Sequence, residues 1–333
     1  MTLWTVFACG AAACLGALAP AALAADWKPT KTVEFVVTSG PGGGTDQFAR
    51  TIQAAITKNK LLDVNVVVVN KGGGSGAEGF IYAKAAAGDA HKLVFGTSNE
   101  WVLPMVAKLA YAADDLKPVA AMVFDEFLLW VNPASPYRDA VSYIAAAKAK
   151  PGDMKMGGAQ AKDVDQLLTQ LIQKASGVKF TYIPFKSGNE VAVQMAGNHI
   201  DSNINNPSEN IGQWKAGTGR PLCVFAPERL AAGPKVTPTE AWSDIPTCKA
   251  AGIPIDEYRM PRTVWTPAKV PDDATAFYVG LMRKVRETPE WKDYIDRSVQ
   301  TDRFLDSAEL KAFEQREAPR ARAIFKEEGW LVN

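Results

Sequence analysis

The fold is decided by the stretch Ser39-Gly40-Pro41-Gly42-Gly43-Gly44-Thr45-Asp46. It follows a β-branched run at 32–38, typical of a strand, and precedes a helical pattern over 47–56. A strand that turns through glycines into a helix leaves backbone N–H groups unpaired at the positive end of the helix dipole. We therefore predict an anion-binding loop whose helix is capped by Thr45 and Asp46. The alternative is a tight turn without a ligand.

A second glycine cluster, at 72–77, follows the strand-like run 64–69 and fits a relaxed Gly-x-Gly-x-x-Ala pattern. Glu100 stands at roughly the distance expected for a ribose contact, which keeps a nucleotide-dependent oxidoreductase as an alternative function. However, Glu100 falls beyond the next strand, 92–96, and the first loop lacks the Lys of a phosphate-binding Walker loop. We expect no nicotinamide, flavin or other cofactor.

The composition excludes several classes of function. The chain has 333 residues, is 47% hydrophobic and carries a formal net charge of +1, which argues against nucleic acid as a partner. It contains only 2 histidines, and neither a His-Glu-x-x-His nor a Gly-x-Ser-x-Gly motif. We therefore expect no enzymatic activity, no catalytic residues and no metal site.

The first 24 residues have the features of a secretory signal peptide. The run 3–23 is apolar and alanine-rich, and it ends in Ala22-Leu23-Ala24, a small-x-small cleavage pattern. We expect export to the periplasm; because the first residues carry no Lys or Arg, a mis-chosen start codon or an uncleaved anchor is the alternative. Cys223 and Cys248 follow the leader, and two cysteines of an exported protein are disulfide candidates; two buried free thiols are the alternative.

Strand-like runs alternate with helical patterns, as in an α/β protein. The expected strands are 32–38, 64–69, 92–96, 118–123, 127–132, 154–157, 180–184, 200–204, 221–226 and 263–266. The expected helices include 45–58, 76–86, 141–148, 163–176, 188–196 and 274–287. The proline-containing segments 133–136 and 254–271 are expected to carry the chain between two lobes. The charged, amphipathic last ~45 residues are expected to pack as helices on the first lobe.

The order of several short motifs resembles the periplasmic solute receptors of tripartite tricarboxylate transporters, the Bug-type receptors. The motifs are Gly40-Pro41-Gly42-Gly43-Gly44-Thr45-Asp46, Val69-Asn70-Lys71-Gly72-Gly73-Gly74-Ser75-Gly76, Phe95-Gly96-Thr97, Ala147-Lys148-Ala149-Lys150-Pro151-Gly152, Tyr182-Ile183-Pro184-Phe185-Lys186-Ser187-Gly188, Gly197-Asn198-His199-Ile200-Asp201 and Glu327-Glu328-Gly329-Trp330. The resemblance implies a two-lobed periplasmic binding protein fold, each lobe a sheet flanked by helices, with the ligand in the cleft between them. It implies lobe 1 at 25–126 and 251–333, and lobe 2 at 127–250.

The function implied by the resemblance is capture of a small carboxylate by cleft closure and its delivery to membrane permease subunits. The carboxylate is expected to be a di- or tricarboxylate or an aromatic carboxylate, and the receptor a monomer. An exported sensory receptor of the same fold is the alternative. Carried over position by position, the ligand-binding residues are Ser39, Gly42, Gly43, Gly44, Thr45, Asp46, Thr97, Ser98, Asn99, Gly158, Gln160, Lys162, Phe185, Ser187, Gly188, Asn205, Asn206 and Arg262.

Four of these positions carry specific expectations. Gln160 and Lys162 stand where relatives commonly have Gly and Ser or Thr, which favours a bulkier or more anionic distal group on the ligand. Arg262 is expected either to meet a ligand carboxylate bidentately or to lie solvated on the surface. Gly43 is expected to adopt a positive φ, so that a β-branched residue there blocks the oxygen of the ligand.

Overall fold

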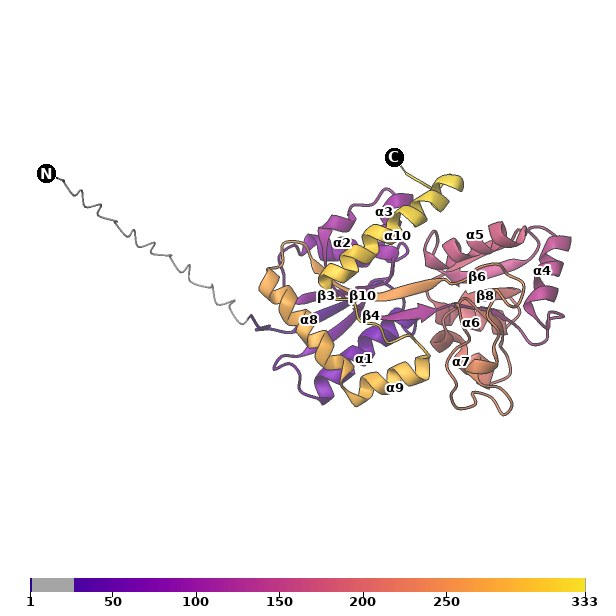
Figure 1. Cartoon of the computed structure of the whole chain (residues 1–333), viewed down its shortest axis with the longest axis horizontal. Coiled ribbons are helices and arrows are strands. Elements are labelled where there is room, and N and C mark those ends of the chain that lie inside the picture. Colours follow the sequence, from indigo (N-terminus) through magenta and orange to yellow (C-terminus); the bar gives the residue numbers. More distant parts are fainter. Residues whose placement is uncertain (2–26, 333) are drawn as a thin grey trace.

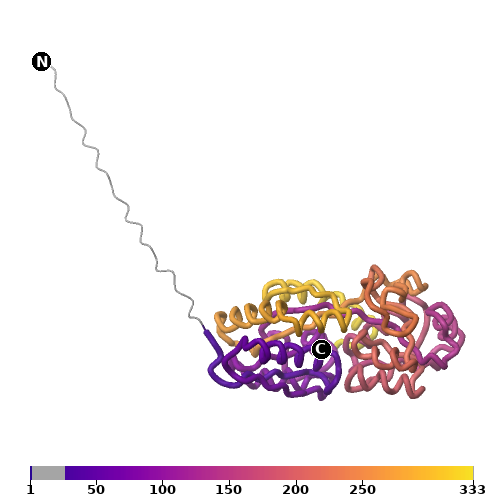
Figure 2. Tube along the Cα trace, turned by 90° about the horizontal axis from the view of Figure 1, so that it is seen from below, coloured from indigo at the N-terminus to yellow at the C-terminus, as the bar shows by residue number. Residues whose placement is uncertain are grey.

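The computed structural model describes Met1 and residues 27–332; the expected signal peptide and its cleavage site lie outside this part, apart from Met1. Two sheets, each flanked by helices, lie side by side along the long axis of the molecule (Figures 1 and 2). The predicted two-lobed α/β architecture is thus confirmed. Within the described residues, no helix combines the length and the apolarity that crossing a bilayer requires.

Lobe 1 is built on a five-stranded sheet with the order β2-β1-β3-β10-β4. Its strands are β1 (Val33–Val37), β2 (Val66–Asn70), β3 (Lys92–Gly96), β4 (Leu116–Glu126) and β10 (Arg259–Pro267). β1 runs parallel to β2 and β3, whereas β10 is antiparallel to both of its neighbours. The β-branched and aromatic residues of β1 are almost wholly buried, which explains why this run forms a central strand.

Within residues 27–332, this lobe has six α-helices, which are labelled in Figure 1, and one short 3-10 helix. They are α1 (Gly44–Lys58), α2 (Ala77–Ala85), α3 (Asn99–Val106), η1 (Ala113–Asp115), α8 (Asp272–Arg286), α9 (Pro289–Ser298) and α10 (Ser307–Glu327). Phe48 of α1 packs edge-on against Phe95 of β3 and Trp291 of α9, which joins the C-terminal helices to the first sheet. The C-terminal segment therefore covers lobe 1, as the sequence predicts (Figure 2).

Lobe 2 has the strand order β7-β6-β8-β5-β9. Its strands are β5 (Leu128–Val131), β6 (Lys155–Ala159), β7 (Thr181–Phe185), β8 (Ser202–Asn205) and β9 (Arg220–Val224). Its helices are α4 (Ala140–Ala149), α5 (Val164–Ser176), α6 (Gly188–Ala196), α7 (Pro207–Lys215) and the 3-10 helix η2 (Trp242–Asp244). The packed aromatic rings of Trp130, Trp214 and Trp242 form part of its core.

The chain passes from lobe 1 to lobe 2 at Phe127, directly between β4 and β5, and returns through β10. The prediction that residues 133–136 carry the chain between the lobes is wrong. This segment forms the turn between β5 and α4, where Asn132 Oδ1 accepts a hydrogen bond from the N–H of Ala134 at 2.8 Å. The prolines here mark a turn within lobe 2 and not a passage between lobes.

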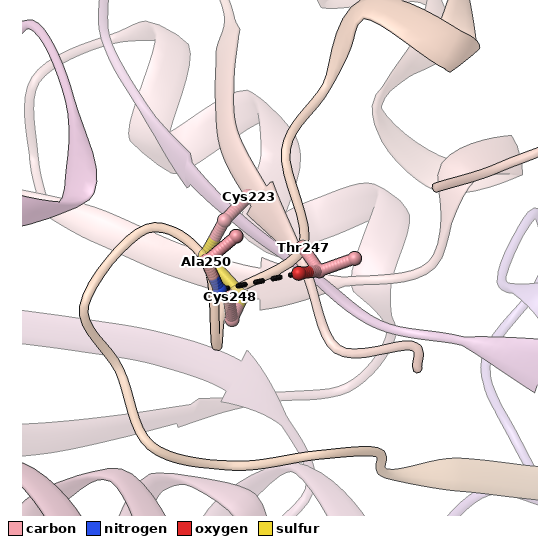
Figure 3. Close-up of a disulfide and its surroundings, with 4 residues drawn as sticks. All are labelled: Cys223, Thr247, Cys248 and Ala250. Atoms are coloured by element: carbon pink, nitrogen blue, oxygen red, sulfur yellow. Dashed lines mark hydrogen bonds between the residues drawn. A yellow bond between two sulfur atoms is a disulfide. The ribbon is translucent and has the colours of Figure 1, made fainter. Parts of the chain in front are cut away.

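Cys223 of β9 and Cys248 form a disulfide in lobe 2 (Figure 3). The turn that carries Cys248 is held by a hydrogen bond from the N–H of Ala250 to Thr247 Oγ1, at 3.2 Å. Both cysteines are fully buried in the hydrophobic core of lobe 2. A bridge across 25 residues stabilises the fold by ~3 kcal/mol in the chain-entropy model.

Candidate functional site

A cavity of about 40 Å³ lies between the two lobes, at the C-terminal ends of β1 and β6. Strand ends of this kind, followed by helix N-termini, are where α/β sheets bind ligands. Both lobes contribute to its lining: Thr38, Ser39, Gly43, Gly44, Thr45, Thr97, Asn99, Met260 and Arg262 come from lobe 1, and Ala159, Gln160, Asp163, Val164, Asp165, Lys186, Ser187, Gly188, Asn206 and Glu209 from lobe 2.

The glycine loop at 39–46 does form the turn into α1, but its details differ from the prediction. Gly42 has a φ of 79°, whereas Gly43 is extended, with a φ of −71°, and serves as the N-cap of α1. The expected positive φ at Gly43 is therefore wrong. The expected side-chain caps are also wrong, because Gly43 has no side chain to cap with; Asp46 instead reaches back and accepts a hydrogen bond from the N–H of Gly42 at 2.9 Å.

Asp46 is held on the side of the loop away from the cavity. Arg50 Nε and Asn70 Nδ2 each donate to its carboxylate at 2.9 Å. Burial opposes the charge of Asp46, but the hydrogen bonds from Arg50, Gly42 and Asn70 outweigh burial and lower the pKa of this carboxyl below its usual value. The charged Asp46 therefore fixes the loop conformation, and it does not line the cavity.

The second glycine cluster supports the first loop. A Cβ at Gly72 would lie 2.8 Å from the carbonyl carbon of Ser39, and one at Gly76, where φ is 94°, would lie 2.7 Å from the oxygen of Thr38. These glycines allow the two loops to pack backbone to backbone. Glu100, the candidate ribose contact, is fully buried, and neither of its carboxylate oxygens has a hydrogen-bond partner among the described residues.

Glu209 accepts a hydrogen bond from one of the backbone N–H groups that the sequence predicts will bind the ligand. The N–H of Gly44, the first residue of α1, donates to Glu209 Oε1 across the cleft at 2.8 Å. Glu209 lies in the first turn of α7, where its Oε2 also accepts from the N–H of Asn206 at 3.3 Å. A Cβ at Gly188, which begins α6, would collide with the same carboxylate. Glu209 thus lies where the N-termini of α1 and α6 meet.

Donors remain at both helix N-termini. In the hydrogen-bond network of residues 27–332, the N–H groups of Thr45 and Gly188 have no acceptor. The hydroxyl of Ser187 accepts from the N–H of Glu190 at 3.4 Å and has no acceptor for its own proton in this network. The cavity therefore presents unpaired donors from both lobes to whatever enters it.

Arg262 lines the cavity but is already paired. Its guanidinium is 2% exposed, and its Nε and Nη2 both donate to Asp125 Oδ2, the former at 2.8 Å. It also donates to Thr45 Oγ1 and Asn206 Oδ1, each at 3.0 Å, and so joins groups of both lobes. Burial opposes its charge, but the groups around it, Asp125 first and then Tyr294 and Glu209, together outweigh burial and raise the pKa of Arg262. The expected alternative of a solvated surface arginine is wrong.

Gln160 and Lys162 contact lobe 1 directly. Gln160 Nε2 donates to the oxygen of Thr38 at 3.0 Å, and Lys162 Nζ lies 3.5 Å from the oxygen of Val106. Between them, the N–H of Ala161 donates to Ser75 Oγ at 3.1 Å. These side chains hold the lobes together in this conformation, and Lys162 does not line the cavity.

The structure gathers part of the predicted set around the cavity. The predicted residues in the lining are Ser39, Gly43, Gly44, Thr45, Thr97, Asn99, Gln160, Ser187, Gly188, Asn206 and Arg262. Those outside it are Gly42, Asp46, Ser98, Gly158, Lys162, Phe185 and Asn205. The carboxylates of Asp163, Asp165 and Glu209 were missed. For Glu209 a signal was present: Asn206-Pro207 followed by Glu209 is a helix start with a capping box.

Asp163 makes the stability of lobe 2 dependent on pH. Burial raises the pKa of its carboxyl to about 7, while its hydrogen bond from the N–H of Val164 favours the charged form. The folded state therefore binds this proton more tightly than the unfolded chain, and stability falls as pH rises from ~4 to ~7. We expect Asp163→Asn, which keeps the cap, to be more stable than the parent at pH 8 by at least ~1.4 kcal/mol and similar at pH 4.

Urea unfolding at both pH values measures this difference. Asp153→Asn, on the turn before β6, is the matched control and should leave the pH profile unchanged. A loss of stability at pH 8 in Asp163→Asn would contradict the argument, since it would show that the charged form is the stabilising one.

The comparisons with known proteins place this architecture in a family. Residues 48–330 match the model of the tripartite tricarboxylate transporter family receptor. The chain is 29% identical to protein BugT of Bordetella pertussis over 229 residues, which cover 66% of this chain and 68% of BugT. The structure of the periplasmic binding protein BugD covers 92% of this chain and 100% of its own, with a TM-score of 0.81 and 20% identity. That of R. palustris Rpa4515 with adipate covers 90% and 98%, with a TM-score of 0.82 and 23% identity. The chain belongs to the family of tripartite tricarboxylate transporter receptors.

Proposed function

We propose that this protein is an extracytoplasmic receptor that captures a small carboxylate between its lobes and delivers it to the permease subunits of a tripartite tricarboxylate transporter. The observation that carries the proposal is the cavity at which the N-termini of α1 and α6, from different lobes, meet with unpaired N–H groups. Helix N-termini favour anions through their free donors and their dipoles. The adipate of Rpa4515 and the periplasmic description of BugD support the same assignment.

The small volume of the cavity determines how a ligand can enter and bind. About 40 Å³ admits only a few water-sized groups, so the lobes must separate before a ligand enters. A ligand that contacts α1 and α6 together can do so only after the lobes close again, which couples binding to closure. The segments at which the chain crosses, Phe127 and the start of β10, are where such a hinge lies. The proposal also includes that the signal peptide is cleaved after Ala24 and that the receptor is a monomer.

A thermal-shift screen of small carboxylates, followed by solution scattering, tests the function. The correct carboxylate at ~100 times its dissociation constant stabilises the protein by ~2.7 kcal/mol. It should also reduce the radius of gyration. The primary amides of the same acids are the matched controls, because they keep the shape of the ligand and lose its charge. A purified protein that carries stoichiometric nucleotide, or that responds equally to acids and amides, contradicts the proposal.

A further inference from the structure

A second groove lies between the lobes, apart from the carboxylate cavity. Its volume is about 860 Å³, and none of the described residues lines both this groove and the cavity of about 40 Å³ at the N-termini of α1 and α6. The sides of the groove come from α9 of lobe 1 and α7 of lobe 2, which are neighbours in Figure 1. Glu126 at the end of β4 and Arg259 at the start of β10 also line it. Small-molecule sites commonly have such a volume and such a place between domains.

The walls of this groove are largely apolar and are built by both lobes. The apolar side chains include Ile211, Leu230, Val236 and Trp242 of lobe 2 and Ile295 and Val299 of lobe 1. Val299 has a φ of 57°, a left-handed conformation that is strained for a β-branched residue. It packs against the apolar core of lobe 2, and Thr301 exchanges two hydrogen bonds of 2.9 Å with the backbone of Phe124 on β4. These contacts hold the strained corner in place, so this wall of the groove is preformed.

One buried carboxylate of the lining has an unused acceptor. Glu126 is 2% exposed, and its Oε1 accepts a hydrogen bond from Thr301 Oγ1 at 2.7 Å. Arg259 Nε lies 3.5 Å from the same oxygen. Within residues 27–332, Glu126 Oε2 has no hydrogen-bond partner. Because a buried acceptor without a donor is unfavourable, a donor group on a molecule in the groove would be stabilised at this oxygen.

The charges of the lining favour an uncharged donor. Five basic side chains line the groove against three carboxylates: Lys215, Arg229, Lys235, Arg259 and Arg297 against Glu126, Glu228 and Asp296. A cationic ligand would be repelled by this excess, most directly by Arg259 beside Glu126. An anionic group would be repelled by the carboxylate of Glu126 itself, which is removed from water. A neutral hydroxyl group avoids both repulsions and supplies the donor.

We propose that the groove between α7 and α9 is a second binding site, for an uncharged apolar molecule that carries a hydroxyl group, such as a phenol or an aliphatic alcohol. The hydroxyl group donates to Glu126 Oε2, and the apolar body packs between the walls at Trp242 and Val299. Burial raises the pKa of Glu126 to about 7, so its carboxylate is mostly charged at pH 8 and forms the stronger, charge-assisted hydrogen bond there. This site does not depend on the carboxylate function.

The test compares pairs in which a methyl ether replaces the hydroxyl group: phenol and anisole, 2-naphthol and 2-methoxynaphthalene, 1-hexanol and its methyl ether. Isothermal titration of the mature chain at pH 8 gives each affinity. We expect the hydroxyl member of at least one pair to bind at least ~10-fold more tightly, the ratio that one charge-assisted hydrogen bond supplies. Glu126→Gln keeps an acceptor for Thr301 and replaces the free acceptor by an N–H donor, so it should remove this preference.

Ala232→Trp provides a second variant should Glu126→Gln fold poorly. Ala232 is exposed and lines the groove, so an indole ring there should fill the space and weaken both members of each pair. Glu257→Gln is the matched control. Glu257 is the other carboxylate beside Arg259, at 3.5 Å from Nε, but it does not line this groove, and its replacement should leave the preference unchanged.

Equal or tighter binding of the ether in every pair overturns the inference, and so does tighter binding of 1-hexylamine than of 1-hexanol. A preference that persists in Glu126→Gln, or an unchanged affinity in Ala232→Trp, also overturns it. If no member of the panel binds, the groove is not a site of this kind, and the carboxylate function is unaffected by that result.

Discussion

Replacing Asp125 by Ala is expected to lower the free energy of unfolding by about 3–5 kcal/mol. Asp125 lies on β4 and is fully buried against Arg262 of the adjacent β10. Removing the carboxylate leaves a guanidinium that is 2% exposed without its counter-charge, and its desolvation is then uncompensated. This decrease in the free energy of unfolding should be several-fold larger than the decrease on breaking a surface ion pair. The reason is that the cost comes from leaving a buried guanidinium unpaired and not from the lost attraction alone.

Denaturant unfolding at neutral pH measures this loss. Asp293→Ala is the matched control: its partner Arg297 lies one turn away on α9, both side chains are more than half exposed, and the expected cost is at most ~0.5 kcal/mol. If Asp125→Ala costs no more than this control, Arg262 finds another partner or water, and the buried pair has no structural role.

Replacing Gly43 by Val is expected to weaken binding of the cognate carboxylate by at least ~100-fold, equivalent to ~2.7 kcal/mol. A Cβ at Gly43 would lie 3.1 Å from Cβ of Ser187 in the opposite lobe, which is already closer than most packed side chains approach. The larger valine side chain therefore keeps the lobes apart. The φ of −71° at Gly43 is accessible to valine, so lobe 1 itself should fold normally.

Titration calorimetry and solution scattering with the ligand found in the screen test this prediction. The variant should show neither the rise in melting temperature nor the decrease in radius of gyration, while its ligand-free circular dichroism stays that of the parent. Gly280→Val, on α8 with no atom within 4 Å of the added Cβ, is the control and should bind normally. Normal binding by Gly43→Val would show that closure does not bring α1 and α6 together around the ligand.

Local sequence patterns predicted every strand of both sheets, but they did not predict the helices α3 and α7. α3 is buried on nearly all sides and contains Pro104, so its sequence has no amphipathic period to detect. α7 begins at Pro207, just after the polar end of β8, and the sequence analysis assigned site residues only as far as Asn206, without predicting the helix that follows. Glu209 was not predicted as a site residue because of this second error: a residue in a helix that is not recognised cannot be placed in a site.

The donors of the site could be predicted, whereas the contacts that its charged side chains make could not. Glycines between a strand and a helix report on the local backbone, which is why the loop at 39–46 is informative on its own. The pairing of Arg262 with Asp125, and the approach of Glu209 to Gly44, join residues that are distant in the sequence and lie on different elements. Such contacts depend on the order of the strands and on how the lobes close, and neither produces a local pattern in the sequence.

The insertion of β10 between β3 and β4 constrains the order in which the chain can fold during synthesis and export. β5 to β9 form one continuous segment, so lobe 2 has all of its strands as soon as Val224 has emerged. Lobe 1 does not, because β3 and β4 are joined only through β10, whose first residue is Arg259. A chain that emerges from its N-terminus therefore exposes the edges of β3 and β4 until lobe 2 is complete. The late strand that closes these edges also carries Arg262 to the cleft, so the ligand-binding cavity is among the last parts of the molecule to assemble.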